Sequence, residues 1–490
     1  MTRITINGKE VEADPKKPLI AACHEHAEQV PMYCYHPGLT PVGSCRICQV
    51  EVQQGDMPPR VVVACRMPIA EGMVVNTEAP GAHDARKQCL EFLLKNHPLD
   101  CPICDKAGEC DLQDYSFAEG QGEGRSVEPR RKLEKRKSLG DTIVLDQERC
   151  ILCSRCVRFF EDVTDKPQLT VSGLGSHSVI STFMDRPLEG NYQGNVADIC
   201  PVGALTLSNF RFKARVWNLE KHLSTCGECS RGCSVTVEVL RRKEVKRIRP
   251  RFNEDVNKWW MCDHGRFAYP QLNDTNRLQG ASLHDQGGSV IAVEREAGVE
   301  AAGNTLCVHA NPYTLVSPWL TVEEGKLARA LCQALGTGLR LVAPPKSDLK
   351  DDLLHTGEAA PNRRGLEDLG FKTQSQENSL AGLADASCAI LIGERIGQLL
   401  GHEELKKLPR SLRLLVLDTH ALCVPATIVC IGVPNAAERT GTWINVDGHE
   451  GRIAAAKPAP TGVAPLERTL AELRERLAQV VDSGASEVQS

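Results

Sequence analysis

Residues 149–156 read RCILCSRC, and residues 198–205 read DICPVGAL. The first stretch places Cys150, Cys153 and Cys156 at two-residue gaps, and the second places Cys200 directly before a proline. In bacterial ferredoxins, a cysteine before proline completes the ligand set of a cluster whose other cysteines lie elsewhere in the chain. Each stretch here supplies what the other lacks. The sequence therefore predicts a ferredoxin-like domain in which these four cysteines, the Cys150 set, bind a single [4Fe–4S] cluster.

Three further groups of potential ligands share the pattern of short gaps, which lets thiolates reach one metal centre from a single turn of backbone. The Cys34 set is like a plant-type [2Fe–2S] site, but its first gap is ten residues. The His97 set has three cysteines, and His97 is the nearest candidate for the fourth ligand, as in Rieske centres. The Cys226 set is complete. The members are Cys34, Cys45, Cys48 and Cys65; His97, Cys101, Cys104 and Cys110; and Cys226, Cys229, Cys233 and Cys262.

The cysteine content is unusual for a chain of 490 residues, because 17 of its 22 cysteines lie between Cys23 and Cys262. A disulfide-rich secreted protein is short and begins with a signal peptide, whereas this chain begins MTRITINGKE. It also has no apolar run of the roughly 18 residues that span a bilayer. We therefore expect thiolates that bind metal, without a signal peptide or transmembrane segment. The net charge of −5 does not point to nucleic acid. The cysteines outside the sets are interpreted as small core residues: Cys23, Cys89, Cys307, Cys332, Cys388, Cys423 and Cys430.

Several one-electron centres in one chain have one evident use, which is to pass electrons along in short steps. The sequence has no GxGxxG motif in a strand–helix context for NAD or flavin, and no Walker-type phosphate loop. We therefore expect other subunits to supply and accept the electrons, and no complete catalytic site in this chain alone.

From residue 1 to about 270 the chain resembles the 75-kDa (G) subunits of respiratory complex I, the NADH:quinone oxidoreductase. The resemblance lies in the ten-residue gap, GSCRIC, NHPLDCPICDKAGECDLQD, RCILCSRCVRF and DICPVGAL. It implies a [2Fe–2S] cluster on the Cys34 set, a histidine-ligated [4Fe–4S] cluster on the His97 set and another [4Fe–4S] cluster on the Cys150 set. The Cys226 set resembles an extra [4Fe–4S] cluster that only some bacterial members carry, off the main electron path.

The same resemblance implies partners and a location. The donors would be the NADH- and FMN-binding subunit and a small [2Fe–2S] subunit, and the acceptor would be the membrane-proximal subunit with two [4Fe–4S] clusters. Other complex I subunits would reduce quinone and translocate protons. The chain would then lie on the cytoplasmic side of the cell membrane, held peripherally through these partners.

The tail resembles a second family. Its segment 426–453 is similar to the molybdopterin-oxidoreductase pattern E-x2-G-T-x2-N-x2-G-x3-R. The tail is much shorter than a complete cofactor-binding domain, and Asp263 follows Cys262 where relatives often carry a lysine nearby. The resemblance thus implies a reduced scaffold, and no molybdopterin is expected. The matching positions are Glu438, Gly441, Thr442, Asn445, Gly448 and Arg452.

These patterns predict a multidomain protein, α+β at first and α/β with a parallel sheet afterwards, whose strand candidates are residues 339–343, 388–392, 412–417 and 428–432. Residues 344–380 are expected to be irregular and the last eight disordered. The expected domains are a β-grasp [2Fe–2S] ferredoxin domain (1–78), a small helical domain for the His97 set (79–120), a ferredoxin-like [4Fe–4S] domain (138–213), a molybdopterin-oxidoreductase-type [4Fe–4S] domain (219–275) and a truncated molybdopterin-oxidoreductase-like α/β domain (276–482).

Three alternatives remain open from the sequence. A diaphorase electron-transfer subunit of an NAD-linked hydrogenase or formate dehydrogenase shares the first three cluster motifs, but such relatives typically stop before the fourth. An iron-only hydrogenase would carry two complete ferredoxin motifs and a cysteine-rich catalytic half. A multi-zinc interaction protein would use the same cysteines without colour, whereas iron–sulfur clusters are brown and are bleached by dithionite.

Overall fold

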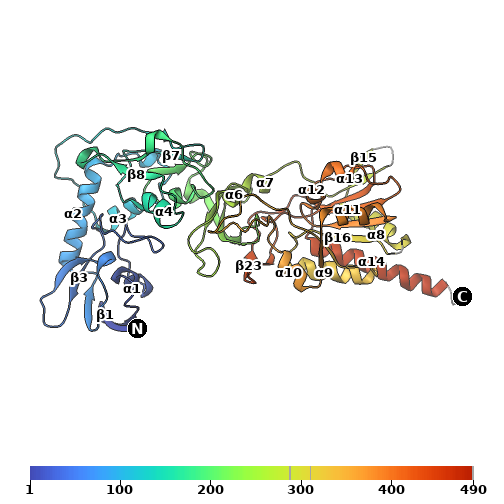
Figure 1. The fold of residues 1–490 in the computed structure, drawn as a ribbon, viewed down its shortest axis with the longest axis horizontal. Helices are drawn as coiled ribbons and strands as arrows, with labels where there is room; N and C mark the ends of the chain where they lie inside the picture. The colour runs from blue at the N-terminus through green and yellow to red at the C-terminus, as the bar shows by residue number, and fades with distance from the viewer. Residues whose placement is uncertain (286–288, 310, 488–490) are drawn as a thin grey trace. The chain divides into compact units, whose positions relative to one another are not determined.

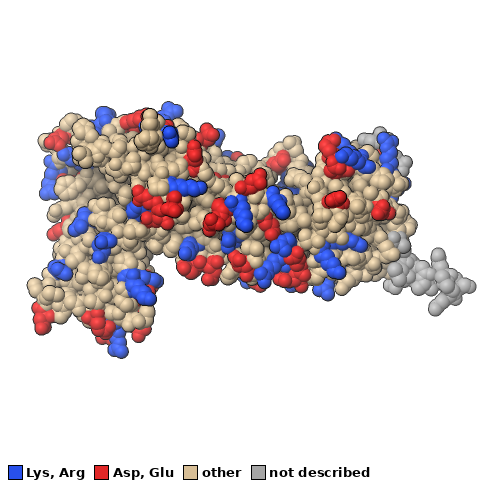
Figure 2. Space-filling view, viewed as in Figure 1, with Lys and Arg blue, Asp and Glu red and all other residues tan. Residues whose placement is uncertain are grey.

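The computed structural model describes residues 1–285, 289–309 and 311–487, and the chain divides into two compact units, Met1–Leu219 and Glu220–Ser490 (Figure 1). No helix in the described ranges is long and apolar enough to cross a membrane. On the face drawn in Figure 2, basic side chains are interspersed with acidic ones.

The first unit begins with a five-stranded sheet in the order β2-β1-β5-β3-β4, accompanied by one helix. β1 pairs antiparallel with β2 and parallel with β5, so the last strand in sequence lies in the middle of the sheet. Alternate residues of β1, β3 and β5 enter one core, including Ile4 and Ile6 with Val50 and Val52. This topology agrees with the expected ferredoxin-like [2Fe–2S] fold. The elements are β1 (Thr2–Ile6), β2 (Lys9–Ala13), α1 (Leu19–Glu25), β3 (Gln49–Gln53), β4 (Arg60–Val63) and β5 (Met73–Asn76).

Two helices follow, α2 (Pro80–Asn96) and α3 (Asp111–Glu119). Arg86 of α2 is buried and joins three segments of the unit. Its guanidinium donates to the carbonyl oxygens of Gln49 and Thr77, at 2.8 and 2.7 Å, and to Oε1 of Glu119 at 2.7 Å. A buried arginine whose donors are all directed at acceptors fixes the angle at which α2 leaves the sheet.

The rest of the first unit is built from short elements around the Cys150 set. They form a three-stranded sheet, β10-β7-β6, and a separate hairpin, β8-β9, with two helices between the strands. The elements are β6 (Lys137–Ser138), β7 (Ile143–Leu145), α4 (Arg155–Asp162), β8 (Leu169–Ser172), β9 (Val179–Thr182), α5 (Asn195–Ile199) and β10 (Leu205–Leu207).

The second unit opens with a three-stranded sheet, in the order β11-β12-β13, that carries the Cys226 set at one end. The strands are β11 (Leu219–Thr225), β12 (Ser234–Leu240) and β13 (Glu244–Pro250), followed by the helical turns α6 (Asp263–Arg266) and α7 (Tyr269–Leu272).

An eight-stranded sheet, ordered β15-β14-β21-β20-β19-β16-β17-β18, forms the rest of the second unit. Strands β21 to β18 run parallel, and β14 and β15 add an antiparallel edge. Ile390 and Ile392 of β19 pack under α8, α9 and α14, whereas Ala389 and Leu391 face α11, α12 and α13 (Figure 1). Both faces are buried, which explains the continuous apolar strands. The strands are β14 (Ala281–His284), β15 (Val290–Val293), β16 (Tyr313–Val316), β17 (Arg340–Val342), β18 (Lys372–Gln374), β19 (Cys388–Ile392), β20 (Arg413–Asp418) and β21 (Thr427–Gly432).

The helices of this unit, and a final hairpin, complete the fold. They are α8 (Arg295–Val308), α9 (Val322–Ala334), α10 (Arg363–Asp368), α11 (Gln376–Ala384), α12 (Ile396–Leu400), α13 (His402–Leu405), β22 (Gly441–Ile444), β23 (Glu450–Ile453) and α14 (Leu466–Glu487).

Two sequence expectations for this unit were wrong. Residues 344–380 are not irregular throughout, because they contain α10, β18 and the start of α11. The end of the chain is helical as far as Glu487, since α14 continues through residues 483–487. The expectation of disorder for 488–490 lies outside the described residues.

Candidate iron–sulfur sites

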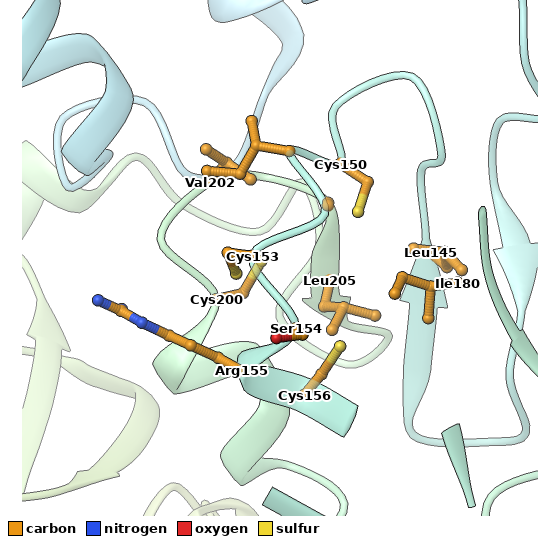
Figure 3. Close-up of a pocket in the computed structure, with 12 residues that line it drawn as sticks. Leu145, Cys150, Cys153, Ser154, Arg155, Cys156, Ile180, Cys200, Val202 and Leu205 are labelled. Atoms are coloured by element: carbon orange, nitrogen blue, oxygen red, sulfur yellow. The ribbon is translucent and has the colours of Figure 1, made fainter. Parts of the chain in front are cut away.

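The Cys150 set surrounds a cavity in the first unit (Figure 3). Cys150 lies in a loop before α4, Cys156 on its first turn, and Cys200 directly after α5. The sulfur atoms of Cys150 and Cys156 point toward the space between them, which leucine, isoleucine and valine side chains enclose. Two non-glycine residues of the loop, Leu152 and Ser154, have left-handed backbone angles, with φ of 52° and 58°. Such strain costs about 1–3 kcal/mol per residue and is concentrated at functional sites.

The thiols of this set lie in an environment that disfavours bare thiolate. Burial raises the pKa of Cys150 to about 12 and that of Cys153 to about 11, and it raises the pKa of Cys156 well above its ordinary value. Bound metal deprotonates a coordinating thiol outright and compensates the charge. In the described residues no group of three or more His, Cys, Asp or Glu side chains is arranged around a single metal ion. Four thiols around an enclosed apolar cavity fit a [4Fe–4S] cluster, whose ligands stand apart around several atoms.

The His97 set lies where α2 ends. His97 is the residue after Asn96, and its Nδ1 is buried without a hydrogen-bond partner in the described part of the chain. Burial, reinforced by the positive charge of Arg149, lowers the pKa of His97 to about 4. The imidazole is therefore neutral at pH 7, which is the form that binds metal. An orphaned buried ring nitrogen is what a missing bond to iron would leave.

The three cysteines of this set differ in exposure. Cys101 is exposed, whereas Cys104 and Cys110 are buried. Burial raises the pKa of both buried thiols, that of Cys110 to about 11. Arg215 donates to the carbonyl oxygen of Cys104 at 2.8 Å and also to that of Pro102, which fixes the loop between the ligands.

The His97 and Cys150 sets approach each other through the residues that follow Cys200. Gly203, three residues after Cys200, lies so close to Cys104 that a Cβ on it would stand 2.2 Å from the Cys104 sulfur. The backbone N–H of Asp111, next to Cys110, donates to the carbonyl oxygen of Pro201 at 3.1 Å. Any side chain larger than hydrogen at position 203 would therefore displace the Cys104 sulfur.

In the Cys34 set, the sulfur atoms lie close to one another. The sulfur atoms of Cys34 and Cys45 are 3.3 Å apart, and the Cys34 N–H donates to the Cys45 sulfur at 3.4 Å. Hydrogen bonds from Cys45 and Cys65 lower the pKa of Cys34, and a hydrogen bond from Cys65 lowers the pKa of Cys48. Gly43 has a φ of +70°, and a Cβ there would meet Arg66 Cγ at 2.9 Å, so the loop that carries Cys45 and Cys48 requires glycine.

The Cys226 set lies in the second unit, with all four thiols at most 9% exposed. Burial raises the pKa of each thiol, that of Cys262 to about 12. The Gly265 N–H points at the Cys262 sulfur at 3.5 Å, and a Cβ on Gly265 would stand 2.7 Å from the Cys226 sulfur. The set is therefore packed against backbone that admits no side chain.

The loop of the Cys226 set is attached to the carboxyl edge of the parallel sheet. The chain turns from one side of the sheet to the other between β16 and β19, and open sheets ordinarily bind ligands at this switch point. Here Trp319, after β16, donates from Nε1 to the Gly227 carbonyl at 3.0 Å. Arg395, after β19, pairs with Glu228 at 2.8 Å and stacks on the Trp319 ring at 4.9 Å.

The tail segment 438–452, for which the sequence suggested a resemblance to molybdopterin oxidoreductases, also contacts this loop. Asn445 donates from Nδ2 to the Arg231 carbonyl at 3.1 Å, and the Arg452 carbonyl accepts from Thr225 Oγ1 at 2.8 Å. Glu438 is buried and accepts from Arg277 at 2.5 Å. In this structure the motif residues thus bind other parts of the protein.

Two buried arginines near the ligands were not anticipated from the sequence. Arg155 and Arg158 on α4 are each 5% exposed. Their donors bind the carbonyls of Tyr35 and Cys34, whereas charged side chains on a short helix would ordinarily be solvated. The sequence shows that Arg155 and Arg158 are one turn apart on one face of the helix. It does not show which groups that face contacts.

Family models match four parts of the chain. They are described as a 2Fe-2S iron-sulfur cluster binding domain (residues 1–80), an NADH-ubiquinone oxidoreductase-G iron-sulfur binding region (86–125), the ferredoxin-like domain of NADH-quinone oxidoreductase subunit 3 (140–206) and the 4Fe-4S domain of NADH-ubiquinone oxidoreductase NDSU1/NuoG-like proteins (230–270).

Curated relatives extend the similarity into the tail. The mitochondrial NADH-ubiquinone oxidoreductase 78 kDa subunit of Neurospora crassa is 37% identical over 399 residues, which is 80% of this chain and 50% of the relative. The G subunit of the NADH-quinone oxidoreductase of Rickettsia felis is 34% identical over 81% of this chain and 56% of the relative. The chain is a homologue of these subunits. The resemblance stated from the sequence motifs is thus confirmed.

This chain spans about half the length of the curated subunits that it matches first. Among solved structures, a chain titled as an NAD+-reducing [NiFe]-hydrogenase in the H2-reduced state is 26% identical and covers 44% of this chain and 91% of that chain. Its TM-score of 0.39 is too low for the likeness to carry a conclusion.

Proposed function

We propose that this chain is the multi-cluster electron-transfer subunit of an NADH:quinone oxidoreductase. The Cys34 set would hold a [2Fe–2S] cluster, and the His97, Cys150 and Cys226 sets would each hold a [4Fe–4S] cluster. Such clusters, when bound, accept and release single electrons. The observation that carries the proposal is that residues beside the Cys150 set contact both neighbouring sets within one unit.

These contacts favour an order of sites in the first unit. Arg155, the residue before Cys156, donates to the Tyr35 carbonyl, next to Cys34, at 2.6 Å. On its other side the Cys150 set meets Cys104 through Gly203. The Cys150 set would therefore be the middle of a relay that begins at the Cys34 set and ends at the His97 set.

The exposed end of this relay has a surface suited to a partner. Cys101 is exposed, and its neighbours Leu99 and Ile103 are 79% and 60% exposed. Trp217, which lies against Gly108 in the same cysteine-rich loop, is 64% exposed. Exposed apolar side chains gathered beside a functional group favour protein–protein contact. We assign this surface to the acceptor, the membrane-proximal subunit with two [4Fe–4S] clusters. The donors, the NADH- and FMN-binding subunit and the small [2Fe–2S] subunit, would approach the Cys34 set.

The second unit would act as a scaffold. Its sheet edge and the Asn445 hairpin are bonded to the loop of the Cys226 set, which supports a structural role for the tail and no bound molybdopterin. Partner subunits would hold the chain on the cytoplasmic side of the cell membrane.

Purification from the native host under anaerobic conditions tests the proposal. Iron, acid-labile sulfide and the spectrum of reduced protein should report one [2Fe–2S] and three [4Fe–4S] clusters. A flavin subunit and membrane subunits should co-purify. A colourless protein with stoichiometric zinc would refute the cluster assignment, and a nickel subunit in their place would favour the hydrogenase alternative.

A matched pair of variants separates loss of a ligand from loss of a buried thiol. Cys156→Ala should remove one [4Fe–4S] signal and stop electron flow from NADH to quinone in the assembled complex. Cys332→Ala removes another buried thiol, from α9, where it packs in the core, and should keep every signal. Equal spectra for the two variants would contradict the assignment of Cys156.

A further inference from the structure

Arg158 connects two of the ligand sets through hydrogen bonds. Its Nη2 donates to the carbonyl of Cys34 at 2.5 Å and to that of Cys153 at 3.2 Å. Its Nη1 donates to the Thr40 carbonyl at 2.6 Å, and its Nε donates to Ser154 Oγ at 3.2 Å. One planar guanidinium therefore binds the backbone of a ligand from the Cys34 set and of a ligand from the Cys150 set.

The charge of Arg158 has no ionic partner in the described residues. The side chain is 5% exposed, and its acceptors are neutral carbonyl and hydroxyl oxygens. Asp162, one turn along α4, exerts an attraction on it, but the Asp162 carboxylate accepts from the Thr40 N–H at 2.7 Å and makes no ion pair with Arg158. A buried cation is costly unless opposite charge compensates it.

The neighbourhood of Arg158 adds positive charge. Arg155 is also buried, and its only carboxylate neighbour in the described part of the chain is Asp111, at 3.9 Å. Two cations thus lie buried between the Cys34 and Cys150 sets with almost no acidic side chain to balance them.

We propose that Arg158 is a positioning residue that sets the potentials of the two sites it joins, an inference that rests on the proposed function. The negative charge that would balance Arg158 is supplied by the thiolate-ligated clusters. A buried cation stabilises the reduced, more negative form of each cluster, so Arg158 raises the midpoint potential at the Cys34 set and at the Cys150 set together. Its hydrogen bonds to the Cys34 and Cys153 carbonyls also hold the two ligand loops against each other.

The test is an EPR-monitored redox titration of the full chain with its clusters reconstituted anaerobically. Arg158→Met keeps most of the volume and removes the charge, and it should lower the midpoint potentials of both the [2Fe–2S] signal and the Cys150-set signal. The signals of the other two sets should stay in place. Arg158→Lys keeps the charge without the planar fork and should bring both potentials back toward those of the parent.

The control is Arg295→Met in the second unit. Arg295 is 2% exposed but is paired with Glu472 at 2.6 Å, so it is a buried arginine whose charge is already balanced. It should shift no potential. Failure of Arg158→Met to move either potential, or an equal shift of all signals, would overturn the inference.

Two further outcomes are decisive. If Arg158→Met fails to assemble its sites, Arg158→Lys decides: potentials close to the parent support the role of the charge, and lowered potentials at both sites refute it. If the parent chain itself takes up no iron and sulfide, the proposed function fails. If the parent holds four clusters but substitution of Arg158 leaves their potentials unchanged, only the inference about Arg158 fails.

Discussion

Gly203→Ala should remove the cluster of the His97 set and leave the others. A Cβ on residue 203 would stand 2.2 Å from the Cys104 sulfur, whereas ordinary contacts begin at 3.4 Å. The sulfur or the backbone must therefore move by about 1.2 Å, and metal–ligand distances tolerate only about 0.2 Å. Overpacking of this kind costs about 1–3 kcal/mol, which the fold can survive while the site does not. The backbone φ of Gly203 is outside the left-handed region, so the effect is purely steric.

The assay is iron and acid-labile sulfide per chain, together with the EPR signals of the reduced protein. Gly203→Ala should lack one [4Fe–4S] equivalent and the signal of the histidine-ligated cluster. Gly122→Ala is the matched control, because no atom lies within 4 Å of the added methyl group. Identical iron content and spectra for the two variants would refute the placement of Cys104 against Gly203, or its role as a ligand.

Three other substitutions probe different features. His97→Cys should keep a cluster but lower its potential, because a thiolate adds negative charge; an unmoved EPR signal in a redox titration would count against His97 as a ligand. Burial raises the pKa of Asp418 from 3.8 to about 6, so the stability that its protonated form contributes is present below about pH 4 and is lost as the pH rises through about 6. Asp418→Asn should therefore flatten the Tm–pH profile between about pH 4 and 6. An unchanged slope would contradict this role of Asp418. Arg86→Met leaves Glu119 without its buried partner and should lower the free energy of unfolding by about 3–5 kcal/mol in denaturant titrations. An unchanged free energy of unfolding would contradict the role of this pair.

The sequence predicted most of the parallel sheet because strand signals rest on local patterns, and the proposed ligand sets rest on patterns that are equally local. Cysteine gaps are read directly, and β19 was predicted at its observed bounds, 388–392, because five apolar residues in a row suit a strand buried on both faces. The sequence did not predict β16, whose four residues, Tyr313–Val316, follow a turn-like Asn-Pro and become a strand only between β17 and β19. Likewise β18 has the sequence KTQ, which carries no apolar signal and is a strand only through its pairing with β17.

The environment of the ligands could not be predicted for a related reason. The sequence RCVRFFED of α4 predicts a helix with charged residues in water, whereas Arg155 and Arg158 are buried with their donors bound to carbonyls far away in sequence. These acceptors are backbone carbonyls, which every residue carries, so the residue types do not reveal which carbonyls the arginines bind. For the same reason, no residue pattern indicated that Gly203 would lie against Cys104.

The attachment of the Cys226 loop to the switch point has a consequence for how the second unit unfolds. Trp319 and Arg395 extend from the ends of central strands, so the loop keeps its shape only while those strands stay paired. Unfolding of the sheet and loss of the cluster proposed for the Cys226 set should then be a single cooperative event. Visible bleaching during heating would report the integrity of a β-sheet that has no colour of its own.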